Sequence, residues 1–573
     1  MIWKEVPYRV VIGRNGRILG DFIETPPEQM INRGRRRGKR ARIPKQSGRT
    51  GDTAEFLCDK TEYVFGVGPD RERASLRHKL FMDKLEQCVR DSGDEAVAKL
   101  IEALLEYERN PVPALPEDVD TETFFVFQFE GELDTLISDR PQVREYWHRQ
   151  RHPDTAASSS KEFTCLITGK PCVPVGRHPP VRRVPGGGPS TPLVSFDDAV
   201  FESYRLSKNE NAPISSDAAE AYVAGLNRLL DREYRDADGN RQPSRRVDLS
   251  RDTAVVFWSR EGSDLVDLFA EVMDASPEAV RVLFESPYTG RRPVLDDPQA
   301  FYAAVISGAK GRAVLRQWME TTVADAARSV RRYFDDIAIV QPGGDIRPQP
   351  LRHLLRSTAA FGETDNIPPH LAADVFAAIL RETTPYPHAL LDASVRRMRA
   401  EQSRRDPKAP WRSGPVPPER AALIKAYLSR ARCLSQLAPN FPEVTMSLDE
   451  KCSNVPYRLG RLFAVLERLQ EVAVRPSATI RDRFFGAASS NPVTVFQRLI
   501  RGAQPHVSKA DAGPYFDKMI GEIIDGLPSA NPFPATLTLQ EQGLFAVGYY
   551  HQRQALFMKK TASDKLASTT SKQ

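Results

Sequence analysis

The chain has 573 residues, of which 81 are Lys or Arg and 75 are Asp or Glu, so its formal net charge is +6 and its pI is about 8.9. No apolar run approaches the roughly 18 residues of a membrane span, and six cysteines are too few for a disulfide framework. These properties exclude a membrane-spanning or disulfide-stapled protein. They predict a soluble, cytoplasmic chain of about three or four domains, whose mild basicity favours nucleic acid as a partner.

The first predicted element is a β-hairpin. Residues 8–12 are β-rich and alternate in polarity, and residues 18–23 return as a second strand. Asn15-Gly16 lies between them and supplies the residue types of a type I′ turn, in which both central residues have positive φ.

A run of basic residues follows the hairpin. Between Gln29 and Gly51 the chain has nine positive charges and no carboxylate. Gly34 and Gly38 interrupt the run, and it lacks apolar periodicity, so we expect a loop that contacts a polyanion. A solvated basic segment is the alternative. The nine residues are Arg33, Arg35, Arg36, Arg37, Lys39, Arg40, Arg42, Lys45 and Arg49.

The remainder of the first half mixes helices and strands. Apolar residues at helical spacing predict helices over 73–89, 95–107, 217–230 and 263–273. Runs rich in β-branched and aromatic residues predict strands over 124–129, 163–167, 193–196 and 254–258. A second charged segment, 231–251, contains Asp238-Gly239 and is expected to form a projecting loop.

Strand signals fade after about Val340, and helical spacing continues over 351–356, 371–381 and 421–434. Five prolines between Arg404 and Glu419 predict a linker, and the polar tail after Lys559 is expected to be disordered. We therefore predict an α+β fold, with a mixed N-terminal half that contains the hairpin and small sheets and an all-helical C-terminal bundle. The expected domains are 1–115, 116–340, 341–445 with the linker at 404–419, and 446–573.

The sequence offers weak candidates for a metal or nucleotide site. No Gly-x-x-x-x-Gly-Lys-Ser/Thr phosphate loop is present. Cys165, Cys172 and His178 could suggest zinc, but the gap between the cysteines is too long for a knuckle and a fourth ligand is not evident. Buried or loop cysteines are the favoured alternative, so neither a metal nor another cofactor is expected.

Pairs of acidic residues could contribute to a two-metal nuclease site, which needs several converging carboxylates. Adjacent residues point in different directions on a strand or helix, so each pair alone is more typical of a cap or a solvated edge. The chain is therefore expected not to be an enzyme. The pairs are Asp197-Asp198, Asp296-Asp297 and Asp335-Asp336.

Further basic residues recur beside an aromatic residue or on predicted helices. Residues 446–573 contain 16 Lys and Arg against 11 Asp and Glu, a net charge of +5. A single nucleic-acid strand could follow such residues, although a solvated helix face is an equally good explanation. The candidates for this contact are Lys310, Arg312 and Arg316, which precede Trp318, and Arg481, Arg483, Arg498 and Arg501.

Several longer stretches resemble one known family. They are NVPYRLGRLF at 454–463, ATIRDRFFGAASS at 478–490, LQEQGLFAVGYYHQRQALF at 539–557, CLITG at 165–169, FESY at 201–204, NAP at 211–213 and RQWMETT at 316–322. The basic run adds Pro44, Gln46, 49–51 and 56–59, with Tyr63 and Gly66. In this order they resemble the large subunit of the type I-C CRISPR surveillance complex, Cascade.

The resemblance implies a non-enzymatic subunit of an RNA-guided antiviral complex. Guide pairing reads the sequence, while the protein recognises the protospacer-adjacent motif (PAM) of the target double-stranded DNA, stabilises the displaced strand of the R-loop and helps recruit a helicase-nuclease. The implied partners are CRISPR RNA, target double-stranded DNA, the backbone, guide 5′-end-binding and small subunits of Cascade, the helicase-nuclease and, as further candidates, anti-CRISPR proteins.

On this interpretation the basic run is divided in two. Arg33 to Arg42 and Lys45 grip duplex phosphates, whereas Gln46, Arg49 and Lys60 are the candidates for reading base edges in the flanking motif. Lys60 stands where the family commonly has Asn. The family also usually has a further segment before the hairpin.

Met446 is a candidate internal start, because the family can make its C-terminal part separately as a small subunit; an ordinary internal methionine is the alternative. Two other functions stay open at this point. A metal-dependent nuclease would use Asp296 or Asp335 and degrade nucleic acid without other subunits. A generic RNA-binding protein would show no preference for a flanking motif.

Overall fold

The computed structural model describes residues 2–25, 40–44, 51–132, 135–151, 163–189, 191–196, 198–236, 239–285, 298–309, 311–404 and 414–558. The chain forms two compact units. Unit 1 comprises Met1–Val175, Ala212–Ser216 and Arg235–Gln242, and unit 2 comprises Gly176–Asn211, Asp217–Tyr234 and Pro243–Gln573. Each unit is described by itself.

A four-stranded sheet forms the centre of unit 1, with the strand order β3-β2-β6-β5. Strand β2 is parallel to β6, and the other two pairings are antiparallel. Tyr8, Val10 and Ile12 of β2 are buried, which is the alternation expected of a strand with one face in the core. The strands are β2 (Tyr8–Ile12), β3 (Ile23–Glu24), β5 (Cys58–Lys60) and β6 (Phe124–Phe129).

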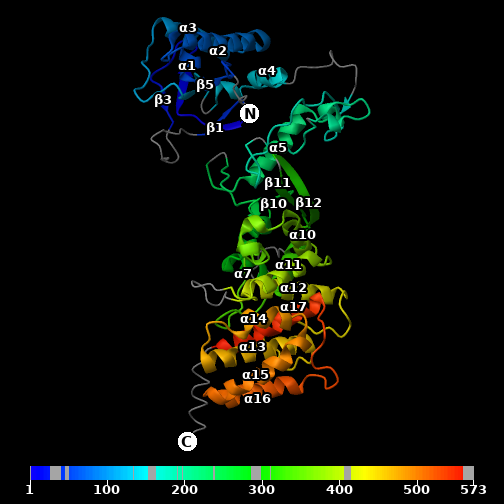
Figure 1. The fold of residues 1–573 in the computed structure, drawn as a ribbon. Helices are drawn as coiled ribbons and strands as arrows, with labels where there is room; N and C mark the ends of the chain where they lie inside the picture. Colours follow the sequence, from blue (N-terminus) through cyan, green and yellow to red (C-terminus); the bar gives the residue numbers. More distant parts are fainter. Residues whose placement is uncertain are drawn as a thin grey trace. The chain divides into compact units, whose positions relative to one another are not determined.

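Helices pack on this sheet and share its hydrophobic core. Asp70 caps α2 by accepting a hydrogen bond from the Arg73 N–H, and Gly93 ends it in the left-handed conformation that glycine favours. Asp94 then caps α3. Helices α2 and α3 contact each other and lie side by side in unit 1 (Figure 1). The helices are α1 (Thr61–Phe65), α2 (Arg71–Ser92), α3 (Glu95–Arg109) and α4 (Pro141–Arg151).

The predicted hairpin forms only in part, because the second strand expected at 18–23 is reduced to β3 (Ile23–Glu24), and its turn also differs from the prediction. Strand β2 pairs with β3, and Ile12 bridges Ile18. In the connection the Gly16 N–H bonds the Gly13 carbonyl and the Gly13 N–H bonds the Arg17 carbonyl, and Gly16 has a φ of 69° whereas Asn15 has no positive φ. The type I′ prediction is therefore wrong. A longer connection, in which both Gly16 and Gly20 have positive φ, joins the strands instead.

The basic run contains a strand and is not a loop throughout. Strand β4 (Arg40–Ile43) pairs antiparallel with β1 (Ile2–Glu5), with Arg40 opposite Glu5 and Arg42 opposite Trp3. Ile43 is fully buried beside Val6, Cys58 and Val126, which explains why this part of a charged run becomes ordered. Residues 26–39 and 45–50 lie outside the described residues.

Two other strand predictions need correction. The strand expected at 163–167 is only β7 (Phe163–Thr164), paired with β8 (Pro171–Cys172), and residues 193–196 form no strand. The segment 231–251, expected to be a projecting loop, contains β9 (Arg246–Asp248), because Val247 is buried against β10.

Unit 2 contains a four-stranded antiparallel sheet with the strand order β12-β11-β10-β9, so β12 is an edge strand (Figure 1). One face packs on α6, α8 and α10, and part of the other face packs on α5. The elements are α5 (Ser216–Leu230), β10 (Thr253–Ser259), α6 (Asp264–Met273), α7 (Pro277–Glu285), β11 (Ala300–Ala309), β12 (Arg312–Thr322) and α8 (Val323–Ile337).

A helical bundle follows, and no strand occurs among the described residues after β12. The α+β prediction is confirmed. The helices are α9 (Leu351–Arg356), α10 (Pro369–Leu380), α11 (His388–Ala400), α12 (Pro418–Cys433), α13 (Val455–Val474), α14 (Ile480–Ala488), α15 (Phe496–Lys509), α16 (Gly513–Asp525) and α17 (Leu539–Phe557). Short 3-10 turns are η1 (Ile137–Asp139), η2 (Ala199–Phe201), η3 (Lys208–Asn211), η6 (Ala360–Gly362), η7 (Thr364–Asn366) and η9 (Pro492–Thr494).

Helix α17 lies in the middle of this bundle and contacts α11, α12 and α13. Two glycines allow α13 and α17 to meet at backbone distance, since a Cβ at Gly460 would overlap the Phe545 carbonyl and a Cβ at Gly548 would overlap the Tyr457 carbonyl. One continuous hydrophobic core extends from Val247 to Tyr550. Residues 414–417, the described end of the predicted linker, are buried, and Pro418 already begins α12.

Candidate nucleic-acid interface

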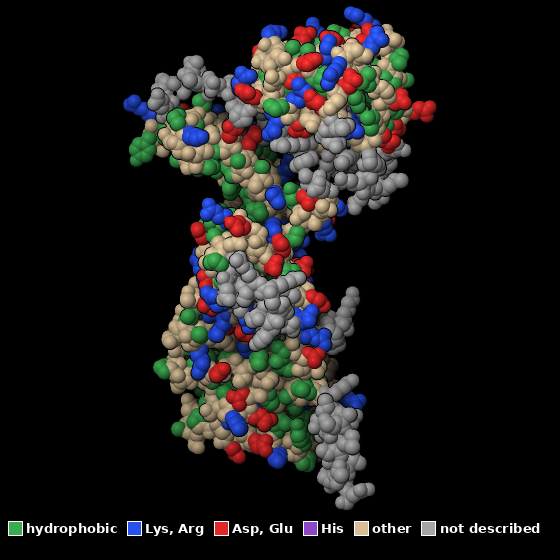
Figure 2. Space-filling model, turned by 180° about the vertical axis from the view of Figure 1, so that it is seen from behind, with side chains coloured by type: hydrophobic (Ala, Val, Ile, Leu, Met, Phe, Trp, Pro, Cys, Tyr) green, Lys and Arg blue, Asp and Glu red, His purple; other side chains and the backbone are tan. Residues whose placement is uncertain are grey.

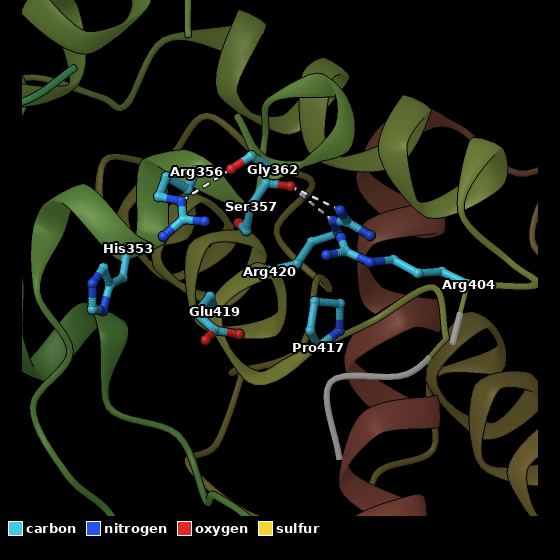
Figure 3. Close-up of a pocket in the computed structure, with 8 residues that line it drawn as sticks. All are labelled: His353, Arg356, Ser357, Gly362, Arg404, Pro417, Glu419 and Arg420. Atoms are coloured by element: carbon cyan, nitrogen blue, oxygen red, sulfur yellow. Dashed lines mark hydrogen bonds between the residues drawn. The ribbon is translucent and has the colours of Figure 1, made fainter. Parts of the chain in front are cut away.

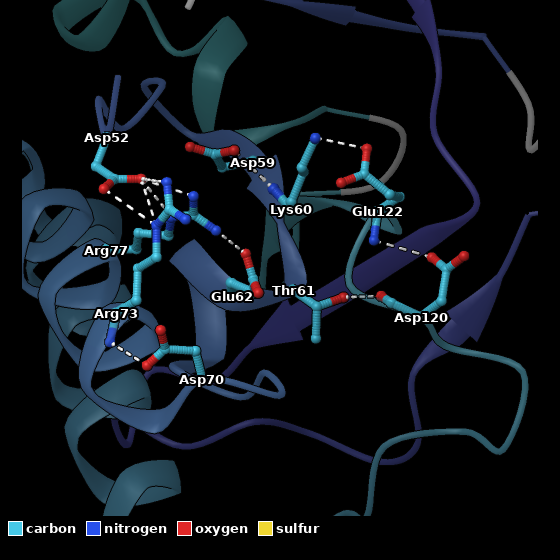
Figure 4. A network of polar contacts seen from close by, with 10 residues as sticks. All are labelled: Asp52, Asp59, Lys60, Thr61, Glu62, Asp70, Arg73, Arg77, Asp120 and Glu122. Atoms are coloured by element: carbon cyan, nitrogen blue, oxygen red, sulfur yellow. Dashed lines mark hydrogen bonds and ion pairs between the residues drawn. The ribbon is translucent and has the colours of Figure 1, made fainter. Parts of the chain in front are cut away.

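Lys60, a candidate for base reading, is held in a polar network at the end of β5 (Figure 4). Its Nζ lies 2.5 Å from the Glu122 carboxylate, and its backbone N–H donates to Asp59 Oδ1 at 2.7 Å. The fully buried Asp59 also accepts a hydrogen bond from the Glu55 N–H at 2.6 Å. The network therefore fixes the backbone of Lys60 and gives its ammonium group a carboxylate partner.

A second ion-pair cluster lies just after residues 45–50 (Figure 4). Arg77 Nη2 is 2.6 Å from Asp52 Oδ1, and Arg73 Nη2 is 3.2 Å from the same oxygen. Hydrogen bonds from Arg77 and then from Arg73 lower the pKa of Asp52, and Arg77 also pairs with Glu62. Asp52 thus ties the chain after the basic run to α2.

The chain is also held by hydrogen bonds just before the basic run and within it. Thr25 Oγ1 donates to the Val6 carbonyl at 2.5 Å, and strand β4 pairs with β1. Arg40 and Arg42 lie in β4. Arg33, Arg35, Arg36, Arg37, Lys39, Lys45, Gln46 and Arg49 lie outside the described residues.

On β12 the structure places Arg312 and Arg316 on an edge strand, and Lys310 lies outside the described residues. The Arg312 guanidinium lies over the Phe201 ring at 5.3 Å, and Arg316 Nε donates to Ser307 Oγ at 2.8 Å. Both residues are exposed, and neither forms an ion pair with a carboxylate within the described part of the chain. Their charges are available to a ligand.

The four C-terminal candidates divide into one buried and three exposed arginines. Arg481 is buried in the bundle, with Nη1 3.1 Å from the Glu467 carboxylate and Nη2 3.5 Å from that of Asp482. Arg483, Arg498 and Arg501 are exposed on α14 and α15, and Arg498 stacks over the Phe484 ring at 5.5 Å. The fold thus uses the charge of Arg481 internally and leaves the other three at the surface.

Sequence reasoning missed a group of buried charges whose role is structural. Asp336 is buried on α8, where Arg430 Nη2 approaches it at 2.6 Å and Arg332 Nε at 3.1 Å. Burial raises the pKa of Asp336, and the charge of Arg430 opposes that effect. No short-range sequence signal could reveal this pair, because its members are 94 residues apart. Asp335, its neighbour in sequence, is exposed.

A basic surface pocket lies near the start of α12 (Figure 3). Arg356 and Arg404 line it with His353, and Arg420 lies at its buried side. Arg420 donates to the Ser357 and Pro415 carbonyls and pairs with Glu401 at 2.9 Å. Its charge is compensated inside the protein, so Arg420 stabilises the packing of α12 rather than offering an exposed cation.

The cysteine segment considered for zinc has hydrogen-bond partners within the protein. Burial opposes ionisation of Cys165, but hydrogen bonds from the backbone of Ser215 and from Thr168 lower its pKa to about 6. His178 Nδ1 lies 2.8 Å from the Tyr222 hydroxyl. Across the described ranges, no group of three or more His, Cys, Asp or Glu side chains is placed to hold a metal ion.

Charges of both signs are interspersed over the face shown in Figure 2. Within the described ranges no helix combines the length and apolar character needed to cross a bilayer.

Comparison with known families identifies the class to which this chain belongs. A family model matches residues 1–557, from the first residue of the chain to the end of α17. The chain is therefore a CRISPR-associated protein of the Cascade type. It belongs to the family described as CRISPR-associated protein (Cas_Csd1). No curated protein matches it.

Proposed function

We propose that this chain is the non-catalytic large subunit of a type I-C Cascade complex. In this role it recognises the PAM of target double-stranded DNA, stabilises the displaced strand of the R-loop and helps recruit the helicase-nuclease. Guide RNA pairing supplies sequence recognition, so the protein needs phosphate contacts and a few base contacts. Family membership supports a place in a CRISPR complex.

One observation carries the proposal for nucleic-acid contact. The exposed arginines Arg312, Arg316, Arg483, Arg498 and Arg501 form no ion pairs with carboxylates in the described part of the chain, whereas the buried Arg420, Arg430 and Arg481 do. An exposed cation without a carboxylate partner attracts phosphate at a small desolvation cost. We assign the exposed set to the displaced strand and do not include Arg481.

The motif-reading contact is assigned to the basic run. Strands β1 and β4 and the Asp52 cluster anchor the chain on either side of residues 45–50. Arginine and glutamine are suited to bidentate contacts with guanine and adenine edges, and Gln46 and Arg49 are the candidates for this contact. Arg33, Arg35, Arg36, Arg37 and Lys39 then supply sequence-independent grip.

A reconstituted complex tests both assignments. Gel shifts on matched targets with varied flanking bases should show binding that depends on the flanking motif and no cleavage. Charge reversal at Arg35, Arg36 and Arg37 should weaken binding to all sequences and reduce the salt slope by roughly 0.9 per lost duplex phosphate contact. Gln46→Ala with Arg49→Ala should instead relax the discrimination between flanking bases.

Arg396→Gln is a matched control, since this exposed arginine of α11 is paired with Asp392 at 3.0 Å. It should leave affinity and salt slope unchanged. Equal binding to every flanking sequence by the wild-type complex would overturn the proposed motif recognition. Magnesium-dependent degradation of DNA by the purified chain would establish the nuclease alternative, and binding to RNA without other subunits would favour a generic RNA-binding protein.

A further inference from the structure

Three large aromatic side chains gather on one face of the unit 2 sheet. Trp258 stacks on Tyr302, with ring centroids 5.5 Å apart and planes inclined by 20°. The Trp318 ring lies 5.5 Å from that of Trp258 and 6.1 Å from that of Tyr302. The three residues come from the adjacent strands β10, β11 and β12 (Figure 1). We call them the aromatic cluster.

The strand register explains why the cluster remains accessible. Its face of the sheet also carries Val256, Ala304 and Ile306, which are buried with α5 residues such as Val223. Helix α5 does not enclose the aromatic cluster, since Trp318 is 47% exposed and Trp258 and Tyr302 are half-buried. Leu315, also 47% exposed, lies on the same strand. The fold therefore leaves ring surface open to solvent.

Three exposed arginines lie on the edge strand β12 or bond its backbone. A β-bulge falls at Arg316, whose Nε donates to Ser307 Oγ on the opposite face of the sheet from Trp318, and Arg381 Nη2 donates to the Trp318 carbonyl at 3.3 Å. Like Arg312, these arginines make no ion pair with a carboxylate within the described ranges. Glu320, opposite Tyr302 in register, is the acidic residue of β12. With Glu382, the exposed residue that follows Arg381, two carboxylates stand against three arginines, so the edge has a net positive charge that favours an anionic partner.

We propose that the aromatic cluster is a stacking site for unpaired bases of a single-stranded nucleic acid, and that Arg312, Arg316 and Arg381 hold its phosphates. Every base has a π face, so such a site binds without sequence preference, as a subunit that accommodates any displaced strand requires. This inference deepens the proposed function and rests on it. The combination of open rings and uncompensated arginines favours nucleic acid over a protein segment, which would need an acidic and apolar surface to match.

Two oligonucleotides of equal length and charge separate base stacking from phosphate binding. The reconstituted complex is titrated with a 12-nucleotide oligodeoxythymidylate and with an abasic strand of the same length. Stacking predicts that wild type binds the strand with bases at least about fivefold more tightly. Trp318→Ala should abolish this preference, whereas Trp318→Phe should largely retain it because it keeps an aromatic face.

Tyr515→Ala, which removes a 57% exposed ring on α16, is the matched control and should leave the preference unchanged. Equal affinity of wild type for the two strands would overturn the proposal, as would an unchanged preference in Trp318→Ala. Impaired assembly with other subunits but intact strand preference in Trp318→Ala would identify a protein contact and also overturn it.

The flanking-motif gel shift is run on the same preparations. Loss of motif-dependent duplex binding by Gln46→Ala with Arg49→Ala, with the base preference retained, leaves both proposals standing. Absence of motif dependence in wild type, with the base preference present, would reject the proposed PAM recognition and keep the stacking site. Motif dependence without base preference would reject only the stacking site.

Discussion

Arg430 and Arg498 both belong to helices of unit 2, yet their surroundings give them different roles. Arg430 is almost fully buried and its guanidinium bonds Asp336, Tyr386 and several backbone carbonyls. Removal of one member of such a pair would leave the other charged and buried, at a cost of about 3–5 kcal/mol. Arg498 is exposed, with an aromatic ring as its contact. Sequence reasoning singled out Arg498 and not Arg430, and burial decides which of the two can meet a ligand.

Lys60 offers a test of the same distinction. Its ammonium group pairs with Glu122, whose side chain is 51% exposed, so loss of this pair should cost only about 0–1 kcal/mol. Lys60→Gln and Glu122→Gln both remove the ion pair, but only the first removes the candidate base-reading group. If Lys60 reads the flanking motif, gel shifts should show altered discrimination for Lys60→Gln alone. The same change in discrimination for both variants would show that Lys60 has only a structural role.

His551 predicts a pH-dependent component of stability. It is buried on α17, its Nδ1 lies 3.0 Å from the Tyr457 hydroxyl, and its Nε2 has no partner in the described part of the chain. Burial lowers its pKa from 6.5 to about 3, so between these values the unfolded chain binds a proton that the folded chain does not. The free energy of unfolding should therefore fall as the pH drops, by up to about 1.4 kcal/mol per pH unit.

Urea unfolding at about pH 7 and about pH 5 measures this effect. His551→Gln lacks the titrating group, so its loss of stability between the two pH values should be smaller than that of wild type. An identical loss in both proteins would contradict the proposed contribution of His551.

At the scale of elements, regular periodicity predicted most helices well, because caps and apolar spacing are local. The predicted helix 217–230 is α5, and the predicted strand 124–129 is β6. Strands that depend on distant partners were harder to predict. Strand β4 lies in a run of arginines and forms because β1 pairs with it and Ile43 is buried. The aromatic cluster was similarly invisible, since it requires the register of three strands.

The contact between α13 and α17 gives a prediction at this scale. Gly460→Ala should destabilise unit 2 by about 1–3 kcal/mol or more, because the new Cβ would overlap the Phe545 carbonyl and push the helices apart. Gly502→Ala is the matched control, since a Cβ there meets nothing within 4 Å. Within α15 it should stabilise by about 0.5–1 kcal/mol through helix propensity. Chemical denaturation measures the free energy of unfolding of both variants. Equal effects of the two substitutions would contradict the close-contact explanation.

For the whole molecule, the hydrophobic core crosses the predicted domain boundaries at 340 and 446. The Val340 N–H bonds the Met446 carbonyl at 2.8 Å, and the Tyr550 hydroxyl donates to the Val340 carbonyl at 2.7 Å. Helix α17 also packs against α11 and α12, which lie before residue 446. The domain boundaries stay predictions. The packing shows that the region after Met446 has apolar contacts with the helices before it.

This packing bears on the hypothesis of an internal start at Met446. A short product beginning there would lack α11 and α12, so we expect it to bind a hydrophobic dye more strongly than the full chain. Met446→Leu should remove the short product and leave the full chain folded, because this side chain is 49% exposed. Immunoblots with an antibody to the C-terminal region measure both forms. Wild-type cells that contain only the full-length form would refute the hypothesis.

The central position of α17 also has a consequence for synthesis. Helices α8 to α16 are all translated before it, and at 5–20 residues per second the interval between α8 and α17 is roughly 10 to 40 s. During that time the apolar surfaces that later enclose α17 have no partner. Unit 2 therefore completes its fold late in translation. We expect a ribosome-associated chaperone to assist its folding. A chain that terminates before α17 cannot form the packed bundle.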